Sequence, residues 1–547
     1  MTRVALGCAC ASLAAIAVAV GGIAGTSATH AAGRSDFSAG FWCGPPLSQS
    51  TPERFRQALD AGFTFSMPPC GDGAGFTVAE NMRILDAAQA AGMPVVVFDY
   101  RMQSALDDPT SRAQLLDEIV ASYSSHPALG GYYVYDEVEP ERIAATGAVV
   151  TGLRARDPQH PAYVSIFPDY APIPDYDKYL RDFVQQVHPS ALVYDYYPFL
   201  ADGSDRTGFF ANISSVRRVA LESSTPFWLF AQLTEIRGLR RASENEKRWQ
   251  ALQALAYGAR GVMFFTYWSN LSGEFPAPGV IDPRTGLPTP HYAEVRRVNT
   301  QARVLAQALL AARSRSVFHN GTLAEGAVMR PPRASVYFPS RAPITTGLFD
   351  TSGYRYAFLA NRNYRATVST AATLAFGRPE RLDLTSGRWV RVRPVRSRAH
   401  SVTIKLTLAP AAAALFRFRK PAAPGPPGAE AVFGRVRANV GRWHLVDSHG
   451  ATYELRSARW RECPAGYELV GTKVGPNGFW LCARRDLAKR AFYLVNLVRG
   501  SARYFRVRSG KVRRLPSVPR PSCGRRSRLI GRLRKPDGFW LCLSKRE

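Results

Sequence analysis

The stretch Gly130-Gly131-Tyr132-Tyr133-Val134-Tyr135-Asp136-Glu137-Val138-Glu139-Pro140 decides the fold of this chain. Strand-forming residues run directly into two adjacent carboxylates, and a proline then opens a helix. Asp136 and Glu137 are therefore expected at the end of a buried strand. In a barrel of alternating strands and helices, the side chains at that end of the strands are the reactive ones.

Short apolar runs alternate with amphipathic runs from residue 41 to about residue 312, which predicts parallel strands joined by helices. We expect eight strands, at residues 41–45, 63–67, 94–100, 131–135, 162–167, 191–196, 227–232 and 261–267. We expect helices at residues 52–61, 78–91, 112–124, 140–154, 176–187, 212–222, 243–257 and 291–312. Eight such units in roughly 270 residues match a (β/α)8 TIM barrel.

The competing architecture is a doubly wound open sheet. That fold calls for a glycine-rich phosphate turn after the first strand, where this chain has Cys43-Gly44-Pro45-Pro46. The barrel, an α/β fold, is expected at residues 36–315. Alternating runs at 354–359, 401–406 and 414–418 predict a β-sandwich over residues 325–420. A Pro/Gly-rich linker is expected at 421–434, and a small, basic, β-rich module at 435–547.

Residues 1–31 have the order of a secretory signal: Arg3, an apolar run from Val4 to Ile23, and small residues up to Ala31. The alternative interpretation of this segment is a membrane anchor. No later run approaches eighteen apolar residues, so we expect no transmembrane span in the mature chain. The expected location is extracellular. Association with the cell wall is a further expectation for the exported protein.

Six cysteines follow the signal, an even number that predicts three disulfides in an oxidising compartment. Cys43 and Cys70 fall just past the first and second expected strands, which are neighbours in a barrel. The other four lie in an internal repeat whose two copies end Pro-(Asn/Asp)-Gly-Phe-Trp-Leu-Cys, and the natural pairs are Cys463 with Cys482 and Cys523 with Cys542. No His-x-x-His or Cys-x-x-Cys spacing indicates a metal, and we expect no cofactor.

Residues 420–547 contain 28 lysines and arginines against 8 acidic residues, so this part supplies +20 of the net charge of +29. A cationic module on an exported protein favours anionic surfaces such as cell-wall polymers, lipid head groups or acidic polysaccharides. Nucleic acid is not expected as a partner, because export removes the usual encounter.

Polar and aromatic residues gather at the ends of the expected strands. The polar ones are Asp99, Arg101, Asp136, Glu137, Asp169, Asp195, Gln232 and Glu235. The aromatic ones that we expect to bind substrate are Trp42, Tyr135, Tyr196, Tyr197, Trp228, Tyr267 and Trp268. A cleft with aromatic walls and a carboxylate floor suits sugars, whose C–H faces stack on rings while their hydroxyls bond to acids and amides.

Glycosidic cleavage needs one carboxylic acid to protonate the leaving oxygen and a second group to stabilise or attack the sugar carbon. Glu137 is the candidate acid, because like-charge repulsion from Asp136 raises its proton affinity. The alternative interpretation of this acidic run is a helix start that complements the macrodipole, a role that we assign to Glu139.

Four phrases carry a resemblance to a known group: 131–137 (GYYVYDE), 194–199 (YDYYPF), 227–232 (FWLFAQ) and 255–268 (LAYGARGVMFFTYW). They resemble bacterial glycoside-hydrolase-like barrels of the clan A and β-galactosidase type, over roughly residues 40 to 420. In retaining enzymes of clan A the fourth strand ends Asn-Glu and the seventh supplies a nucleophilic Glu. The resemblance implies that Glu137 is the acid/base, with Asp136 at the Asn position.

The seventh strand departs from this pattern, because Gln232 stands where a carboxylate is wanted and Glu235 lies three residues further on. A retaining mechanism follows if Glu235 lies about 5–5.5 Å from Glu137. Otherwise the Asp136-Glu137 pair resembles that of β-N-acetylhexosaminidases, which use the substrate's own acetamido group as nucleophile, and Asp195 then helps hold the substrate. Asp195 as the direct nucleophile is the third alternative.

The sequence thus predicts a secreted glycoside hydrolase that acts on a polysaccharide or glycan. The alternative from another class is a non-catalytic glycan-binding or cell-wall-binding protein on a barrel scaffold, consistent with the missing carboxylate at Gln232. A third interpretation makes the basic module the functional end and the barrel a passenger.

Overall fold

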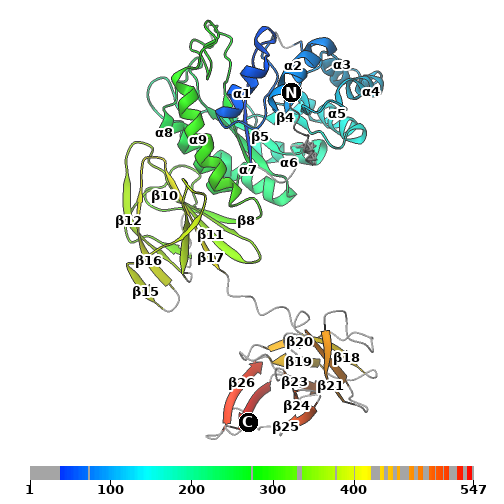
Figure 1. Cartoon of the computed structure of the whole chain (residues 1–547), viewed down its shortest axis with the longest axis vertical. Helices are drawn as coiled ribbons and strands as arrows, with labels where there is room; N and C mark the ends of the chain where they lie inside the picture. Colours follow the sequence, from blue (N-terminus) through cyan, green and yellow to red (C-terminus); the bar gives the residue numbers. More distant parts are fainter. Residues whose placement is uncertain are drawn as a thin grey trace, which may run out of the picture. The chain divides into compact units, whose positions relative to one another are not determined.

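The computed structural model describes residues 37–71, 74–272, 275–328, 335–375, 378–398 and 401–419, and ten strands between residues 431 and 544. They form two compact units, which divide after Arg419 (Figure 1). The expected signal segment 1–31 and residues 421–430 of the expected linker lie outside the described residues. No helix in the described ranges is both long and apolar enough to cross a membrane.

The first unit is built around a parallel sheet of seven strands, wrapped by helices in the blue-to-green part of Figure 1. Their order in space is β1 (Ser38–Phe41), β7 (Gly261–Phe265), β6 (Phe227–Gln232), β5 (Leu192–Tyr196), β4 (Ala162–Ile166), β3 (Leu129–Tyr135) and β2 (Val95–Val97). Apart from the irregular member described next, the order follows the chain, as a TIM barrel requires.

Residues 63–67 close the gap between β1 and β2. The Thr64 N–H donates to the Ala39 carbonyl at 2.7 Å, and the Val96 N–H donates to the Ser66 carbonyl at 3.0 Å. This segment makes only a single bridge, between Ser66 and Val95. The expected eight-membered cylinder is therefore confirmed, but its second member is an irregular ladder segment and not the regular strand that we expected.

The fold-deciding stretch depends on a glycine inside β3. Gly131 has φ of +147°, and a Cβ at this position would lie 2.4 Å from the Pro161 carbonyl oxygen. Only glycine tolerates both the backbone conformation and this close approach. The pair Gly130-Gly131 thus lets β3 pass tightly beside the segment that leads into β4.

The expected helices are present, most of them within a few residues of their expected bounds. They are α1 (Pro52–Asp60), α2 (Val78–Ala91), α4 (Arg112–Tyr123), α5 (Ile143–Arg156), α6 (Tyr176–Val187), α7 (Phe209–Ser223), α8 (Glu244–Tyr257) and α9 (Pro290–Gln307). The sequence interpretation missed the short α3 (Met102–Asp107) and took the 3-10 turns η1 (Leu47–Gln49) and η2 (Pro140–Arg142) for loop and α-helix. Ser243 and Glu246 form the expected capping box at the start of α8.

Side chains of the barrel strands alternate between its interior and the surrounding helices. The interior cluster contains Phe65, Met67, Val96, Tyr163, Ala191, Val193, Phe230 and Met263. The residues between them in sequence, such as Val164 and Leu229, pack in the larger core beneath the helices. This alternation decides which strand-end residues meet inside the cylinder.

Two further sheets complete the first unit, as the expected sandwich requires. One has the order β14 (Trp389–Arg391), β13 (Pro379–Leu382), β17 (Ala413–Arg419), β11 (Tyr354–Asn361), β10 (Ile344–Asp350) and β8 (Arg313–His319). The other has the order β15 (Arg396–Arg398), β16 (Ser401–Leu408), β12 (Val368–Leu374) and β9 (Val336–Tyr337). A single cluster of apolar side chains joins the two sheets.

Helix α8 is buried along most of its length, since it packs on β6 of the barrel and on β8, β10 and β11 of the neighbouring sheet. The Trp249 indole N–H donates to the Arg362 carbonyl at 2.9 Å. The Tyr257 hydroxyl and His319 Nε2 are 2.8 Å apart in a hydrogen bond. One helix therefore serves both the barrel and the sandwich.

The second unit consists of antiparallel strands, yellow to red in Figure 1. One sheet has the order β18 (Ala431–Arg435), β22 (Phe479–Arg484) and β21 (Tyr467–Lys473). A second has the order β20 (Thr452–Leu455), β19 (Arg442–Val446), β23 (Phe492–Val498), β24 (Ser501–Arg508) and β25 (Lys511–Leu515). The third pairs β26 (Ser527–Leu533) with β27 (Phe539–Ser544). We expected the linker to run to residue 434. A strand begins already at residue 431, because β18 pairs with β22.

The predicted internal repeat is present as two hairpins, β21–β22 and β26–β27. Both have a register shift at the same place, between Leu469 and Gly471 in one and between Leu529 and Gly531 in the other. Cys482 is disulfide-bonded. Cys463, Cys523 and the side chain of Cys542 lie outside the described residues.

Candidate active site

The chain turns sharply where β3 ends. Glu137 has φ of +50°, a left-handed conformation that is uncommon outside glycine and that often marks a functional turn. Its N–H donates to Ser165 Oγ at 3.0 Å, and the Ser165 hydroxyl donates to Asp136 Oδ1. The Val138 N–H donates to the Ser165 carbonyl at 3.2 Å. Ser165 of β4 thus holds the backbone of the turn and one of its carboxylates.

Asp195 meets Glu137 across the mouth of the cylinder. On β5, Val193 points into the barrel interior, so Asp195, two residues on, points the same way. The carboxyl groups of Asp195 and Glu137 are hydrogen-bonded to each other. Two carboxylates cannot bond in this way unless one carries a proton, because an ionised carboxylate only accepts.

Burial is the main reason why both groups hold protons unusually well. It raises the pKa of Glu137 to about 7, helped by the negative charge of Asp136 and opposed by the hydrogen bond from Asp195. Asp195 is only 7% exposed. Burial, and then the charges of Glu137 and Asp136, raise the pKa of Asp195 well above its usual range. The two carboxyl groups therefore share one proton and titrate as a pair.

Asp136 is reached by solvent and yet has many protein atoms around its carboxyl group. The surrounding protein raises the pKa of its carboxyl group to about 6, and the Ser165 hydroxyl opposes that rise. Because solvent access limits such a rise, Asp136 is charged at neutral pH. It places a fixed negative charge beside the Glu137–Asp195 pair.

Aromatic rings lie below and above the three acids. Tyr163 precedes Ser165 by two residues on β4 and stacks at 6.2 Å on Tyr133 inside the barrel. Above the acids, the Tyr170 hydroxyl is 3.5 Å from Asp195 Oδ2, and the Arg206 guanidinium lies 3.9 Å from the centre of the Tyr170 ring. Tyr170 is 40% exposed. It can therefore contact both Asp195 and a ligand.

Two of the expected aromatic residues stand at the barrel interior. Trp42 packs edge-on against Tyr133 and Phe230, with centroids 5.8 Å apart in each case. Tyr197 lies 5.8 Å from Phe265. Both are partly exposed, so they form wall positions at the end of the cylinder where the acids lie.

Other expected aromatic residues are turned away from the acids. Tyr196 and Tyr267 are fully buried in the core beneath the helices, and Trp268 packs there under Arg54 of α1. Tyr135 faces Arg142 and Glu139. In a strand buried on both faces, the sequence does not reveal which alternate set points inward.

Trp228 points inward but at the opposite end of the barrel. It is the first inward residue of β6 and pairs with Gly261, where β7 begins. It lies four positions before Gln232, which stands at the far end of β6, and four positions correspond to about 13 Å along a strand. This ring therefore fills the barrel floor.

Two polar residues that we expected to bind substrate are engaged by the protein itself. Both carboxylate oxygens of Asp99 bond to Arg101, each at 2.8 Å, and Oδ2 also accepts from the Tyr123 hydroxyl at 2.6 Å. Gln232 Oε1 accepts from the Phe199 N–H, and Nε2 donates to the carbonyls of Phe199 and Arg240. Gln232 thus clamps two loops together and is no free ligand.

Glu235 lies exposed on the loop after β6. The charges that raise the pKa of Glu137 are those of Asp136 and Glu139, and those that act on Asp195 come from Glu137 and Asp136. Among the described residues, the acid in contact with Glu137 is Asp195. The structure does not bring Glu235 to the pair.

The expected disulfide between Cys43 and Cys70 is present, with the two Cα atoms 4.7 Å apart. It ties the loop after β1 to the loop after the closing segment 63–67. The bridge therefore stiffens the rim of the barrel on the side of the acids.

The sequence interpretation missed Ser165 and Tyr163 and gave no role to Tyr170. The sequence does contain a signal for Ser165 and Tyr163. They are two positions apart on one strand and so share a face, and that strand lies between the two strands that end in acids. The arrangement can hold one proton between two carboxyl groups at the end of the barrel. No group of three or more metal-ligating side chains occurs in the part of the chain that the structure describes.

No protein-family model matches the chain, and no curated protein matches it. Solved structures do. One described as a glycoside hydrolase has a TM-score of 0.47 at 10% identity, over 72% of this chain and 96% of that one. A catalytic mutant of a GH42 beta-galactosidase from G. stearothermophilus has a TM-score of 0.48 at 10% identity, over 71% and 100%. The beta-galactosidase from Bacillus circulans sp. alkalophilus has 0.46 at 9% identity, over 70% and 99%.

Proposed function

We propose that this protein is a glycoside hydrolase whose acid and nucleophile are Glu137 and Asp195. One observation carries the proposal: the two carboxyl groups share a hydrogen bond at the mouth of the barrel, next to a third acid. Glycosidic cleavage needs one protonated and one ionised carboxyl group on either side of the sugar carbon. A pair that holds one proton near neutral pH supplies both.

Glu137 is the better proton donor to a substrate, because its side chain is the more exposed of the two. A sugar that enters between the carboxyl groups replaces their mutual hydrogen bond. The proton then resides on Glu137, and Asp195 becomes the carboxylate that faces the sugar. Asp136, held by Ser165, keeps the proton affinity of Glu137 high throughout.

The reaction would proceed by double displacement. The Asp195 carboxylate attacks the anomeric carbon while the bond to the leaving oxygen breaks, and that oxygen takes the proton from Glu137. Glu137 then removes a proton from water, which attacks the same carbon and releases Asp195. The direct contact of the two acids favours this path over inversion, which needs carboxyl groups about 6.5–9.5 Å apart to admit a water.

The experiment compares the wild type with Glu137→Gln and Asp195→Asn on aryl glycosides and isolated cell-wall glycans. We expect each variant to release sugar at least about 100-fold more slowly. Glu141→Gln is the matched control, since it makes the same change at an exposed position four residues away. Glu235→Gln tests the other candidate nucleophile and should keep its activity.

Equal sugar release by the wild type and Glu137→Gln would remove the hydrolase proposal. Binding of a glycan without release by the wild type would establish the alternative, a non-catalytic glycan-binding protein. Loss of activity in Glu235→Gln but not in Asp195→Asn would overturn the assignment of the nucleophile alone.

We also propose that the protein is exported and acts on a polysaccharide of an anionic cell envelope. The sequence of residues 1–31 supports export, and the excess of +20 on residues 420–547 supports attraction to anionic polymers. The full chain should be retained on isolated cell walls at low salt and released as salt rises, because ions screen the attraction. A chain truncated after Arg419 should lose the salt-sensitive retention; equal retention would contradict the role of the module.

A further inference from the structure

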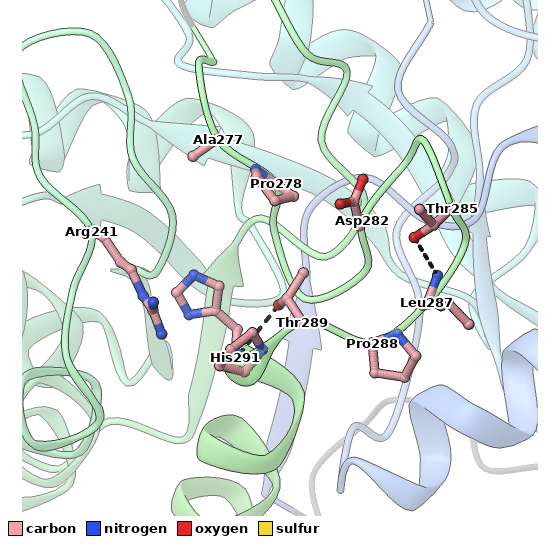
Figure 2. Close-up of a pocket in the computed structure, with 10 residues that line it drawn as sticks. Arg241, Ala277, Pro278, Asp282, Thr285, Leu287, Pro288, Thr289 and His291 are labelled. Atoms are coloured by element: carbon pink, nitrogen blue, oxygen red, sulfur yellow. Dashed lines mark hydrogen bonds between the residues drawn. The ribbon is translucent and has the colours of Figure 1, made fainter.

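A hollow of about 370 Å³ opens on the loops that follow β6 and β7, next to the start of α9 (Figure 2). These loops lie at the same end of the barrel as Glu137, but the hollow is lined by different residues. Its polar lining comes from Arg241, Asp282, Thr285, Thr289 and His291. Figure 2 shows the His291 ring beside the Arg241 guanidinium. The volume is within the range of sites that hold small ligands, ~300–1,000 Å³.

The charge around this hollow is unbalanced. Glu294 of α9 contacts two cations: Arg241 Nη2 is 3.1 Å from Oε1, and Lys247 Nζ is 2.6 Å from Oε2. Asp282 is neutralised by Arg284 at 2.8 Å. Within this group of five side chains, three cations face two carboxylates, and Arg241, half-exposed, is the cation that lines the hollow.

His291 lies beside the same charged groups. It is 4% exposed, and its Nδ1 lies 3.3 Å from Glu294 Oε2. Burial is the main cause that lowers the pKa of His291 to about 4; the hydrogen bond to Glu294 opposes it, and the charges of Lys247 and Arg241 add to it. The ring is therefore neutral at pH 7, and an anion bound in the hollow would make its protonation easier.

The rest of the lining is apolar. Pro278, Pro288 and Leu287 form these walls, and Leu287 is largely exposed. The Thr285 hydroxyl accepts from the Leu287 N–H at 3.2 Å and can still donate. A cation, a hydroxyl and apolar walls together fit a ring that has both C–H faces and a carboxylate, as a uronic acid does.

We propose that this hollow binds a uronate residue of an acidic glycan, with its carboxylate on Arg241 and its ring against Pro278, Pro288 and Leu287. The site shares no lining residue with the Glu137–Asp195 pair. It goes beyond the proposed hydrolysis, and the failure of either leaves the other standing.

The test uses the full chain and three probes, D-glucuronate, D-glucose and acetate, in titrations followed by calorimetry and by the NMR signal of the His291 ring. We expect glucuronate to bind and to raise the pKa of His291 by about one pH unit or more. Arg241→Gln should weaken glucuronate binding at least ~10-fold. Arg303→Gln removes an exposed arginine of α9 that does not line the hollow and should leave binding unchanged.

Binding of glucose as tight as that of glucuronate would overturn the role of charge, and equal binding of acetate would overturn the role of the ring. An unchanged pKa of His291 at saturating glucuronate overturns the site itself. This last readout uses the wild type, so it decides the matter even if Arg241→Gln does not fold.

Discussion

The side chains of Glu137 and Asp195 are hydrogen-bonded to each other although both are acids. The contact joins the turn after β3 to the end of β5, two strands away in the barrel. It makes the protonation of each acid depend on the other. The free energy of unfolding should therefore depend on pH through the titration of this pair.

We predict that Glu137→Gln stabilises the protein at pH 8 but not at pH 4. The pKa of Glu137 is raised from 4.5 to about 7 on folding. A raised pKa stabilises the folded state below pH 4.5, and that stabilisation is lost as the pH rises to 7. Glutamine does not titrate. The gain at pH 8 should be about 1–3 kcal/mol, since one pKa unit is worth ~1.4 kcal/mol and solvent access weakens the effect.

Urea unfolding at pH 4, 6 and 8 measures this difference between wild type and variant. Glu141→Gln should show no such trend, because Glu141 is exposed. A gain for Glu137→Gln that is constant across this pH range would contradict the raised pKa.

We predict that Ser165→Ala damages both the turn and the chemistry. It removes the acceptor for the Glu137 N–H and the donor to Asp136, and should cost about 1–3 kcal/mol of unfolding free energy. The Ser165 hydrogen bond lowers the pKa of Asp136, so its loss should weaken the negative charge that raises the pKa of Glu137. The basic limb of the pH–rate profile, where Glu137 loses its proton, should then move to lower pH. Ser165→Thr keeps the hydroxyl and should keep the profile. An unchanged basic limb in Ser165→Ala would refute the role of Ser165.

We predict that Gln232→Glu does not create a working nucleophile. Gln232 is fully buried, and its Nε2 donates to the carbonyls of Phe199 and Arg240. A carboxylate there would face two carbonyl oxygens and should cost at least about 3 kcal/mol. Urea unfolding measures the loss, and Gln159→Glu, at an exposed position, is the control. Activity above wild type in Gln232→Glu would contradict the clamp role.

We predict that replacing Cys43 and Cys70 by alanine destabilises the first unit. The bridge spans 27 residues, and the loop-entropy estimate for that length is ~3.5 kcal/mol. Thermal unfolding without reductant should show the loss. Reduction of the wild type should reproduce it. If the double variant unfolds at the wild-type temperature, the bridge does not stiffen the rim.

The order of strands and helices could be predicted because hydrophobic period and caps are local signals, as at Ser243 and Glu246. Strand boundaries were less predictable. The first strand ends at Phe41 and not at residue 45, since Cys43 adopts a positive φ of 56°. The closing segment 63–67 pairs on both sides without regular strand geometry, which no residue pattern reveals.

The acids of the candidate site could be predicted, but their partners could not. Asp136, Glu137 and Asp195 follow apolar runs, and that position alone marks them. Whether a neighbouring tyrosine faces the cylinder or the helices depends on strand register, so Tyr196 was placed wrongly and Tyr163 was overlooked. The role of Gln232 depends on two loops that meet only in the folded chain.

Helix α8 has consequences for how this protein can be divided. Trp249 and Tyr257 of α8 are hydrogen-bonded to residues of the sandwich. A fragment that stops at residue 312 would therefore expose a large apolar face of this helix to water. Such a fragment should aggregate when expressed, whereas a chain ending at Arg419 keeps the helix covered. The barrel and the sandwich therefore form a single structural unit. Neither part can be transferred to another protein without the other.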